Sequence, residues 1–492
     1  MKSVLALCCI LLLMGTSYPC RAGFKVTKVC DSVVDAKALT LKDSVGGFKA
    51  TKDLYGGPNI NAVHCAQDVV VTHGKYQYVG YYDAKARLAL ARRKLPAGDW
   101  ESIRFADYIF KSNDDHNTIC IGVCPNDGTI HMAFDHHGNP LHYRVSQKGA
   151  ATDPESVRWD ASLFGPVISE LEKGKRLRSI TYPRFWQTPE GNLQFCYRIG
   201  WSGGGDRILV DYDGHKGTWS NTRQIDSRRG HFLDTFSPSP SRCSYPNGYN
   251  YGPKGRLHVT WTWRERSQGP NHDIMYAYSE DRGKTWLNNQ GEKLKDPPHI
   301  GSAGIQVVDI SRKYSLMNTQ AQAVDSQGRI HVVMWHTTDA TLKAANMKRE
   351  TGSGDVQRWG PPDARRYHHY WRAKNGVWQH RELPWVSGTI AKLFIDANDN
   401  AFLVYGAKKS PDIPVEIHDL DHNCTIAAAT GKSKWKDWQI IHAENESFLS
   451  DMLGDLYRWQ NEGVLSIIVQ ETPKVPGEST PLRILDFSFE YE

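Results

Sequence analysis

The chain has 492 residues and a formal net charge of +6, with 60 Lys and Arg against 54 Asp and Glu. Its basic residues are dispersed, which argues against a nucleic-acid-binding protein, because such a protein would carry a denser basic patch. A polyanionic substrate is compatible with this charge but is not required by it. The 16 Trp, 22 Tyr and 20 His are residues that strand packing and carbohydrate stacking would both use.

The first 22 residues have the features of an export signal. Lys2 precedes an apolar run, VLALCCILLLMG, and residues 20–22 (CRA) approximate a cleavage site. The run is too short and wrongly flanked for a stable membrane helix, and no other long apolar run follows. We therefore expect residues 1–22 to be a signal peptide, and the protein to be secreted or periplasmic without a membrane span. Acylation of Cys20 is a weaker alternative, because the usual leucine does not precede it.

Seven cysteines remain after the predicted signal, at positions 30, 65, 120, 124, 196, 243 and 424. An odd and sparse set excludes a fold built on disulfides, although one or two bridges are compatible with an oxidising compartment. Cys120 and Cys124 belong to one strand-like run, so we expect no bridge between them.

One short phrase returns seven times: a tight turn, then a strand of alternating apolar and polar residues. The turns carry Gly74, Gly128, Gly191, Gly255, Gly328, the degenerate Asp399-Asn400, and Gly463, at intervals between 54 and 73 residues. All-β repeats of this length are typical of propeller blades. The sequence therefore predicts an all-β fold, a seven-bladed β-propeller that forms a single catalytic domain over residues 23–492.

Several blades are also expected to close with a turn that leads into tryptophan. These residues are Trp100, Trp159, Trp219, Trp286, Trp378 and Trp438. The fullest copy, SEDRGKTW at residues 279–286, fits the Asp-box pattern S-x-D-x-G-x-T-W. There the carboxylate can accept hydrogen bonds from its own turn while the tryptophan packs between sheets, so a structural role is predicted.

Helical periodicity is nearly absent. The one candidate helix covers residues 162–176 (SLFGPVISELEKGKR), between blades two and three. Residues 340–375 form a polar insertion with Gly and Pro, for which we predict a long surface loop.

Four segments place titratable residues at the ends of predicted inner strands: NDDHN (113–117), FDHHG (134–138), SITYPRF (179–185) and CYRIG (196–200). His116 and His136 flank one hairpin. Tyr182 and Arg198 flank the hairpin of the following blade. If the two blades are neighbours, all four side chains can face one end of the ring.

This set suits β-elimination from a uronate. A base must take the C5 proton, an acid must protonate the departing O4 oxygen, and a cation must neutralise the carboxylate. Histidine can be a base near neutral pH, tyrosine near a cation can be base or acid, and arginine offers a planar fork to a carboxylate. Each residue alone has an ordinary structural explanation, in a turn, a packed strand or a surface ion pair. Only their joint placement favours a site.

The blocks DDHNTICIGVCPNDGTIHMAFDHHGNPLHYR, SITYPRFWQTPEGNLQFCYRIGWSGGG and GRLHVTWTWRE resemble the BNR-4 group of seven-bladed propellers. Within that group they are most similar to the bacterial ulvan lyases of polysaccharide lyase family 25. The resemblance covers essentially the whole mature chain. It implies a lyase that cleaves ulvan, a uronate-containing, rhamnose-rich sulfated polysaccharide, to give unsaturated uronate ends. The expected partner is this anionic polysaccharide, not nucleic acid, and the expected state is a monomer.

The resemblance also assigns roles to residues. It implies that His116 and Tyr182 handle the protons, that Arg198 neutralises the carboxylate, and that His136 and Tyr245 line the site. Which of His116 and Tyr182 is the base stays open. His136 is preferred over His137 because strand alternation lets only one of the two face the site.

Relatives in the same superfamily supply the alternatives. One group hydrolyses the rhamnose–glucuronate linkage of arabinogalactan caps with a histidine on the opposite face of the propeller, in the first blade, and another cuts the same cap by elimination. His64 lies close to that region, with Gln67 as the other candidate. An α-L-rhamnosidase or a rhamnose–glucuronate lyase is therefore the alternative. A glycan-binding propeller without activity would not need proton donors, and a sialidase would carry an early Arg-Ile-Pro segment.

No cofactor is required for the elimination, since the set is chemically complete without a metal. A structural Zn²⁺ or Ca²⁺ site is a separate hypothesis, with ligands from the middle blades: Asp234, Cys243, His258 and His272. No close-spaced ligand pair supports it, and a packed histidine in an alternating strand explains His258 equally well.

Overall fold

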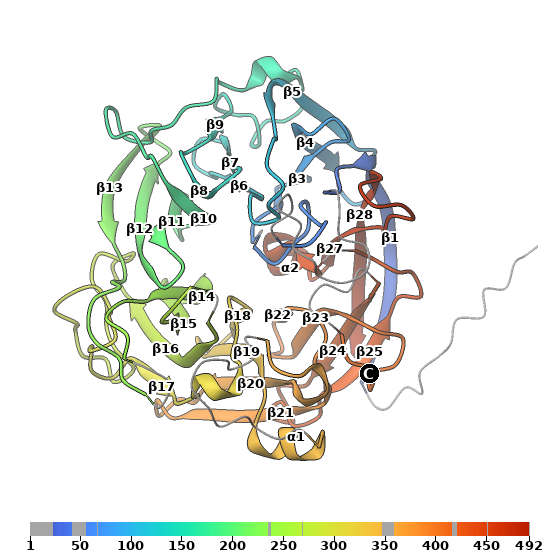
Figure 1. Ribbon diagram of the computed structural model, residues 1–492. Coiled ribbons are helices and arrows are strands. Elements are labelled where there is room, and N and C mark those ends of the chain that lie inside the picture. Colours follow the sequence, from blue (N-terminus) through green and yellow to red (C-terminus); the bar gives the residue numbers. More distant parts are fainter. Residues whose placement is uncertain are drawn as a thin grey trace, which may run out of the picture.

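The computed structural model describes residues 23–41, 56–65, 67–234, 238–267, 269–346, 359–415, 421–449 and 451–491. The predicted signal peptide, residues 1–22, lies outside the described residues. Within the described part, the strands form seven antiparallel sheets arranged as blades around an axis (Figure 1). The prediction of an all-β, seven-bladed propeller is confirmed.

The first three blades follow one another along the chain. Blade 1 contains β2 (Val70–His73), β3 (Tyr76–Tyr82), β4 (Arg87–Lys94) and β5 (Glu101–Ile109). Blade 2 contains β6 (Ile119–Val123), β7 (Ile130–Phe134) and β9 (Tyr143–Val145). Blade 3 contains β10 (Ile180–Gln187), β11 (Leu193–Trp201), β12 (Gly204–Asp213) and β13 (Thr218–Gln224), with the short β8 (His137–Asn139) at the free edge of β10.

The remaining blades continue in order. Blade 4 contains β14 (Cys243–Tyr251), β15 (Leu257–Arg264), β16 (Asn271–Ser279) and β17 (Gln306–Val308). Blade 5 contains β18 (Ala321–Val324), β19 (Ile330–His336), β20 (Arg366–Arg372) and β21 (Trp378–Val386). Blade 6 contains β22 (Lys392–Ile395), β23 (Ala401–Ala407), β24 (Asn423–Ala429) and β25 (Gln439–Ala443). Blade 7 contains β26 (Leu453–Gly454), β27 (Leu465–Gln470), β28 (Thr480–Tyr491) and β1 (Phe24–Ala38).

Blade 7 closes the ring by joining strands from the two ends of the described chain. β1 pairs antiparallel with β28, from Phe24 opposite Tyr491 to Ala38 opposite Thr480. The two strands lie side by side at the ring's edge (Figure 1). Closure therefore rests on backbone hydrogen bonds between β1 and β28.

The repeated turns precede the second strand of each blade, as the repeat predicts. All seven turn residues have positive φ, for example 76° at Gly328 and 61° at Asp399. Glycine adopts this region without strain, and aspartate tolerates it better than most residues, so the degenerate copy keeps the same turn. The second strands β7, β19, β23 and β27 are buried along their whole length, because neighbouring blades pack on both of their faces.

The first strands of the blades line the axis. β6 lies beside β10, β14 beside β18, and β18 beside β22. Side chains from these strands, and from the loops that lead into them, therefore meet near the centre of the ring even when they come from distant parts of the sequence.

The Asp-box has the predicted structural role. Asp281 accepts hydrogen bonds from the backbone N–H and the hydroxyl of Thr285, both at 2.8 Å. The Ser279 hydroxyl accepts from the Gly283 N–H at 2.7 Å. Trp286 is buried in the core that blades 3 and 4 share.

Two local predictions are wrong. Residues 162–176 contain only the end of a 3-10 turn, η1 (Ala161–Leu163), because Gly165 and Pro166 break the helical pattern and the segment instead forms isolated bridges such as Ser146 to Phe164. Residues 340–375 are not one loop. They include most of helix α1 (Asp339–Ala344) and strand β20 of blade 5, while residues 347–358 lie outside the described part.

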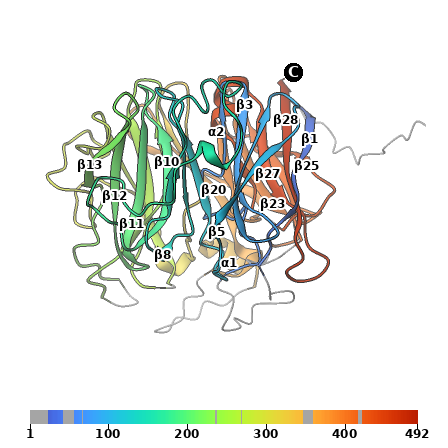
Figure 2. The ribbon, with the colours of Figure 1, turned by 90° about the horizontal axis from the view of Figure 1, so that it is seen from above.

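The other helical elements are short. They are α2 (Leu456–Glu462), η2 (Arg312–Tyr314) and η3 (Pro362–Ala364). α1 and α2 lie at opposite ends of the ring (Figure 2). None of the helices in the described ranges has the length and apolar character needed to cross a membrane. The seven cysteines that the structure describes are all free thiols.

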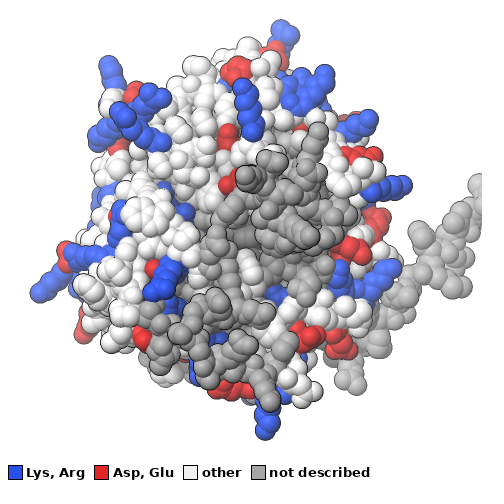
Figure 3. All heavy atoms as spheres, viewed as in Figure 1, with Lys and Arg blue, Asp and Glu red and all other residues white. Residues whose placement is uncertain are grey.

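Charge is distributed evenly on the face seen in Figure 3. Lys and Arg project around its rim with Asp and Glu among them, rather than gathering in one patch. This agrees with the dispersed charge of the sequence. The part of this face that is not grey therefore offers no broad basic surface to an anionic ligand.

Candidate active site

His116, in the turn before β6, is held by two carboxylates. Its Nδ1 lies 2.7 Å from Asp114 Oδ1 and 2.7 Å from Asp115 Oδ1. The Gly57 N–H donates to the other oxygen of Asp115 and fixes that carboxylate in place. Burial opposes a charged ring, but Asp115 and Asp114 outweigh it and raise the pKa of His116 to about 10. His116 is therefore an imidazolium at neutral pH.

His137, the first residue of β8, shares Asp114 with His116. Its Nδ1 lies 2.6 Å from Asp114 Oδ2. The two rings stack with centroids 4.5 Å apart and planes 11° apart. Burial would raise the pKa of Asp114, but the hydrogen bonds from His116 and His137 hold that pKa well below its usual range. One carboxylate thus orients two imidazoles.

His136 does not face this cluster, so the choice of His136 over His137 is wrong. His136 is fully buried, and its Nε2 accepts a hydrogen bond from the His142 N–H at 2.8 Å. Burial lowers the pKa of His136 well below its ordinary value, which leaves a neutral core histidine. The alternation fails here because β7 ends at Phe134 and Asp135 has a φ of 64°, which redirects the chain before β8 begins.

Tyr182 lies opposite the two histidines, on β10. Its ring centroid is 6.0 Å from that of His116 and 5.9 Å from that of His137. Its φ is 53°, within a bulge between Thr181 and Arg184, so the ring leaves the normal alternation of the strand. Burial raises the pKa of Tyr182 well above its ordinary value. The hydroxyl therefore keeps its proton at neutral pH.

Arg198 and Tyr245 complete the predicted set. Arg198, on β11, pairs in register with Thr181, and its guanidinium lies 5.0 Å from the centre of the Tyr182 ring. Arg198 Nη1 donates to the Tyr245 hydroxyl at 3.4 Å. Both Arg198 and Tyr245 are buried. The structure thus brings together His116, Tyr182, Arg198 and Tyr245, with His137 in the place expected for His136.

Arg264 is a member of this cluster that the prediction missed. Its Nη1 donates to the Tyr245 hydroxyl at 2.9 Å, and its guanidinium lies 4.3 Å from the centre of that ring. Asn271 Oδ1 accepts from its Nε at 3.0 Å. Arg264 ends the second strand of blade 4, β15, so an arginine after an apolar second strand, the signal that identified Arg198, could have found it.

A pocket opens beside Tyr182 and Tyr245. The free volume within it is about 20 Å³, which is room for a water molecule or a group of similar size. The lining residues are His64, Cys65, Gln67, Tyr182, Arg184, Arg207, Tyr245, Pro246, Asn318 and Thr319. The residues come from several blades, as expected for a site near the axis.

His64 belongs to this pocket, so the expectation that it lies on the opposite face of the ring is wrong. The His64 N–H donates to Asp451 Oδ2 at 2.8 Å, and its Nδ1 lies 3.1 Å from the same oxygen. Its Nε2 is buried and has no hydrogen-bond partner among the described residues. The arrangement is that of a carboxylate-oriented histidine beside Tyr182.

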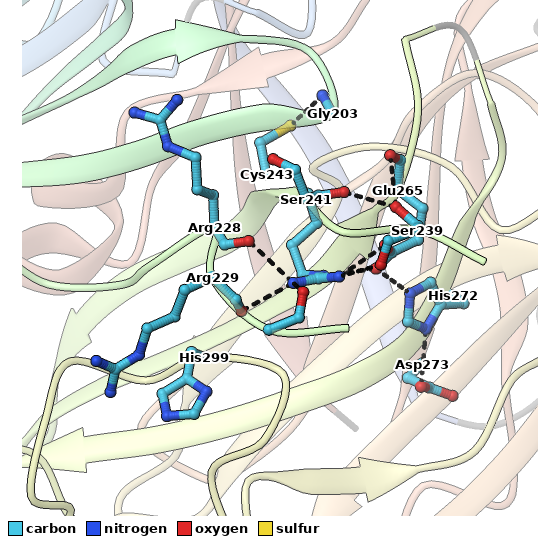
Figure 4. A network of polar contacts seen from close by, with 12 residues as sticks. Gly203, Arg228, Arg229, Ser239, Ser241, Cys243, Glu265, His272, Asp273 and His299 are labelled. Atoms are coloured by element: carbon cyan, nitrogen blue, oxygen red, sulfur yellow. Dashed lines mark hydrogen bonds and ion pairs between the residues drawn. The ribbon is translucent and has the colours of Figure 1, made fainter. Parts of the chain in front are cut away.

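The four residues considered for a structural metal do not meet. Figure 4 shows Cys243 and His272 in one polar network but with different partners: Cys243 accepts from the Gly203 N–H, while His272 contacts Glu265 and Asp273. His258 contacts the Tyr276 hydroxyl at 2.8 Å. In register, His258 and His272 are five positions apart along β15, or about 17 Å. Asp234 forms an ion pair with Arg312.

A different trio has donor atoms close enough for a metal. One atom each from Asp114, His116 and His137 lies within 4.8 Å of the others. A metal there would have to displace the protons that His116 and His137 share with Asp114, so the contacts described above are those of a hydrogen-bonded ion-pair cluster.

Comparison with known proteins places the chain in a family. Residues 76–385 match the family model described as a BNR repeat-containing family member, and the chain belongs to this family. Two curated relatives are ulvan lyases, both long isoforms. That of Pseudoalteromonas sp. (strain PLSV) is 26% identical over 295 residues, which are 50% of this chain and 28% of the relative. That of an Alteromonas sp. is 27% identical over 343 residues, which are 57% of this chain and 32% of the relative. The matched part thus spans about a third of each long relative.

Solved structures share the fold. The crystal structure of polysaccharide lyase Uly1 has a TM-score of 0.69 at 16% identity, covering 94% of this chain and 99% of that one. A PL25 ulvan lyase bound to -[GlcA(1-4)Rha3S]- has a TM-score of 0.60 at 13% identity, covering 87% of this chain and 94% of that one. Their likeness extends to the whole ring.

Proposed function

We propose that this protein is an exported polysaccharide lyase that cleaves ulvan by β-elimination. The observation that carries the proposal is the cluster of His116, His137, Tyr182, Arg198 and Tyr245, which puts proton-transfer groups next to a buried guanidinium. The curated relatives named ulvan lyases, and a similar fold bound to a glucuronate–rhamnose sulfate chain, support the choice of substrate.

The cations neutralise the uronate carboxylate. Arg198 offers a planar pair of N–H donors, and the His116 imidazolium adds a second positive charge on the other side of Tyr182. Fixed positive charge stabilises the enolate-like intermediate more than the ground state, because the carboxylate gains charge as the C5 proton leaves.

Tyr182 is the proton donor to the leaving group. Its hydroxyl keeps its proton at neutral pH, because burial disfavours the phenolate. In the elimination the C5–H electrons form the C4–C5 double bond, the C4–O4 bond breaks, and O4 takes the proton of Tyr182. General acid catalysis of this kind contributes about 10²–10⁴-fold.

His137 is the proton acceptor. Asp114 faces its Nδ1, so in the neutral ring the proton resides on Nδ1 and the lone pair on Nε2. The stacked His116 supplies a positive charge beside it. This assignment gives the base role to neither His116 nor Tyr182, because neighbouring carboxylates favour the protonated form of His116 and burial favours that of Tyr182.

The test is incubation of the purified protein with ulvan, followed by ultraviolet absorbance and product size. Elimination raises the absorbance of the conjugated unsaturated uronate as the polymer shortens. Tyr182→Phe, which removes only the hydroxyl, should lose this signal. Shorter products with flat absorbance would show hydrolysis instead, and an unchanged polymer would show that ulvan is not the substrate.

Cleavage of a rhamnose–glucuronate cap, by an α-L-rhamnosidase or a lyase, is the second candidate. It is favoured by the His64–Asp451 pair, whose buried Nε2 lines the same pocket as Tyr182. Free rhamnose released from arabinogalactan without new ultraviolet absorbance would support the hydrolase.

Export is part of the main proposal, because a polysaccharide substrate lies outside the cell. Mass spectrometry of the mature N-terminus tests cleavage after residue 22.

A further inference from the structure

Two arginines on the wall of the pocket have N–H groups without acceptors. Arg207, on β12, is only 2% exposed, and its Nε donates to the Ser244 hydroxyl at 2.9 Å. Its Nη2 donates to the Ser244 carbonyl at 3.3 Å, but Nη1 has no hydrogen-bond partner among the described residues. A buried guanidinium N–H without an acceptor is unfavourable, so its position beside a pocket indicates a ligand that accepts hydrogen bonds.

Arg184 is the second arginine. It lies two residues after Tyr182 on β10, and neither its Nε nor its Nη1 has a hydrogen-bond partner in the described structure. The Asp68 carboxylate is 3.8 Å from Nε, too far for a hydrogen bond. The guanidinium packs over the Tyr249 ring at 5.4 Å, which holds it in place and leaves its N–H groups for the pocket.

A third cation, Lys392 on β22, stands behind the pocket wall. Its Nζ donates to Gln67 Oε1 at 2.9 Å and to the Gln320 carbonyl at 3.3 Å. Burial and the nearby Arg184 lower the pKa of Lys392 to about 7. The charged form of Lys392 is therefore disfavoured beside Arg184, and a bound anion would stabilise it.

The acidic groups around these cations are engaged elsewhere. Asp68 accepts from the Phe185 N–H at 3.2 Å, and Asp451 is bound to His64. Asp226 accepts a hydrogen bond from the backbone N–H of Arg207 at 2.9 Å, and its Oδ2 lies 3.8 Å from Arg207 Nε. Burial raises the pKa of Asp68, and that of Asp226 to about 6. None of the three fills the unpartnered N–H positions.

We propose that Arg184 and Arg207, supported by Lys392, form a subsite for a sulfate ester on the sugar next to the uronate. This inference rests on the proposed function and adds that the same site recognises the sulfate group of the substrate. A tetrahedral oxyanion presents acceptors in several directions, which suits N–H groups that come from two strands, whereas the flat uronate carboxylate suits the single fork of Arg198. The pocket is shared with Tyr182, so the two anions would lie on adjacent sugars.

The first experiment compares ulvan with chemically desulfated ulvan. The wild-type protein should prefer the sulfated polymer by about tenfold or more in kcat/KM, the value of one charge-assisted hydrogen bond. Arg184→Gln should bring this preference close to one. The control is Arg158→Gln, an exposed arginine outside the pocket, which should keep the wild-type preference. If Arg184→Gln loses the same factor on both polymers, Arg184 does not recognise sulfate.

The second experiment separates this inference from the lyase proposal, because it needs no turnover. Calorimetry measures binding of inorganic sulfate, rhamnose 3-sulfate and glucuronate to the wild type and to Arg184→Gln and Lys392→Met, with circular dichroism to confirm folding. Rhamnose 3-sulfate should bind the wild type and be lost in both variants, while glucuronate is unaffected by either. Loss of glucuronate binding in Arg184→Gln would make the pocket a carboxylate site, and binding of inorganic sulfate alone would show an adventitious ion only. Either result overturns the subsite, as does the absence of any sulfate binding.

Discussion

His116 and His137 stack face to face, 4.5 Å between ring centroids, and Asp114 bridges the Nδ1 atoms of both. His116 precedes the β6–β7 hairpin of blade 2, and His137 follows it at the start of β8. The pair therefore depends on the geometry of blade 2 and on the edge position of β8. Because one carboxylate serves two rings, a change at any of the three residues removes a contact of at least one of the others. The pair is therefore the most sensitive part of the proposed site.

Replacement of His137 should stop turnover without unfolding the protein. His137→Ala removes the proposed base, and we expect kcat to fall about 10²–10⁴-fold, with little change in melting temperature because the ring is partly exposed. The matched control is its neighbour. His136→Ala deletes a buried ring that accepts from the His142 N–H, so it should cost about 1–3 kcal/mol of stability while the remaining folded protein stays active. Loss of turnover in His136→Ala, with normal turnover in His137→Ala, would instead place His136 in the site.

The pH dependence of activity should follow the charge of His116. Its pKa is raised to about 10, so kcat/KM should fall as the pH rises through this value and the imidazolium is lost. Asp115→Asn removes the carboxylate that contributes most to this shift, and the alkaline limb should move to lower pH. An unchanged limb would show that another group controls it.

Stability should change in the same pH range. The folded pKa of His116, about 10, is above its ordinary value of 6.5, so the ionised ring stabilises the fold fully below pH 6.5. This contribution is lost as the pH rises from 6.5 through about 10. Urea denaturation across this range should show a smaller loss for Asp115→Asn than for the wild type.

His64 distinguishes the two proposed activities. If elimination depends on His137 and Tyr182, then Tyr182→Phe should abolish the ultraviolet signal from ulvan, while His64→Ala changes it by less than about tenfold. If rhamnose release is the activity, His64→Ala should reduce it by about 10²–10⁴-fold, since the base or acid is then lost. Product analysis by mass spectrometry on both polymers checks the assignment.

Removal of metal ions should leave the elimination intact. The proposed steps use side chains alone, so dialysis against a chelator is expected to change kcat by less than twofold. Metal content before and after dialysis provides the control. A loss of activity that Zn²⁺ or Ca²⁺ restores would contradict the proposal, and a lower melting temperature with normal activity would indicate a structural ion.

Gly328 tests the conformational origin of the repeat. Its φ is 76°, and an added Cβ would meet no atom within 4 Å, so Gly328→Ala should cost only the strain of the left-handed region, about 1–2 kcal/mol. Gly328→Asn should cost less, since Asn tolerates this region and Asp399 occupies the equivalent turn. Equal losses in the two variants would point to a cause other than backbone strain. Thermal denaturation measures both.

The ring could be predicted from the sequence because its determinants are local. Each blade needs a left-handed turn residue and a buried second strand, and both leave a mark at a regular interval, even at Asp399 where glycine is replaced. The axial pocket could not be predicted in this way. His64, Arg207 and Lys392 come from three blades, and only the packing of the first strands brings them near Tyr182.

The errors within the site have equally specific causes. Alternation predicts the direction of a side chain only while the strand lasts, and the positive φ of Asp135 ends it one residue before the choice between His136 and His137. Tyr182 leaves its strand pattern for a similar reason, at a bulge. Arg198 and Tyr245, which stay in regular strand pairing, could be predicted, whereas alternation gives no guide to His137 and Tyr182, which follow a break in the strand pattern.

The pairing of β1 with β28 has a mechanical consequence. Phe24 lies opposite Tyr491, so the two outer ends of the described chain lie at the same end of one antiparallel pair. A force that draws these ends apart would act on the β1–β28 hydrogen bonds one after another. It would not load all of them at once, as a shearing force along the strands would. The other blades are joined by continuous chain. The propeller should therefore yield first at this seam, at low force, and open as a ring before any other blade comes apart.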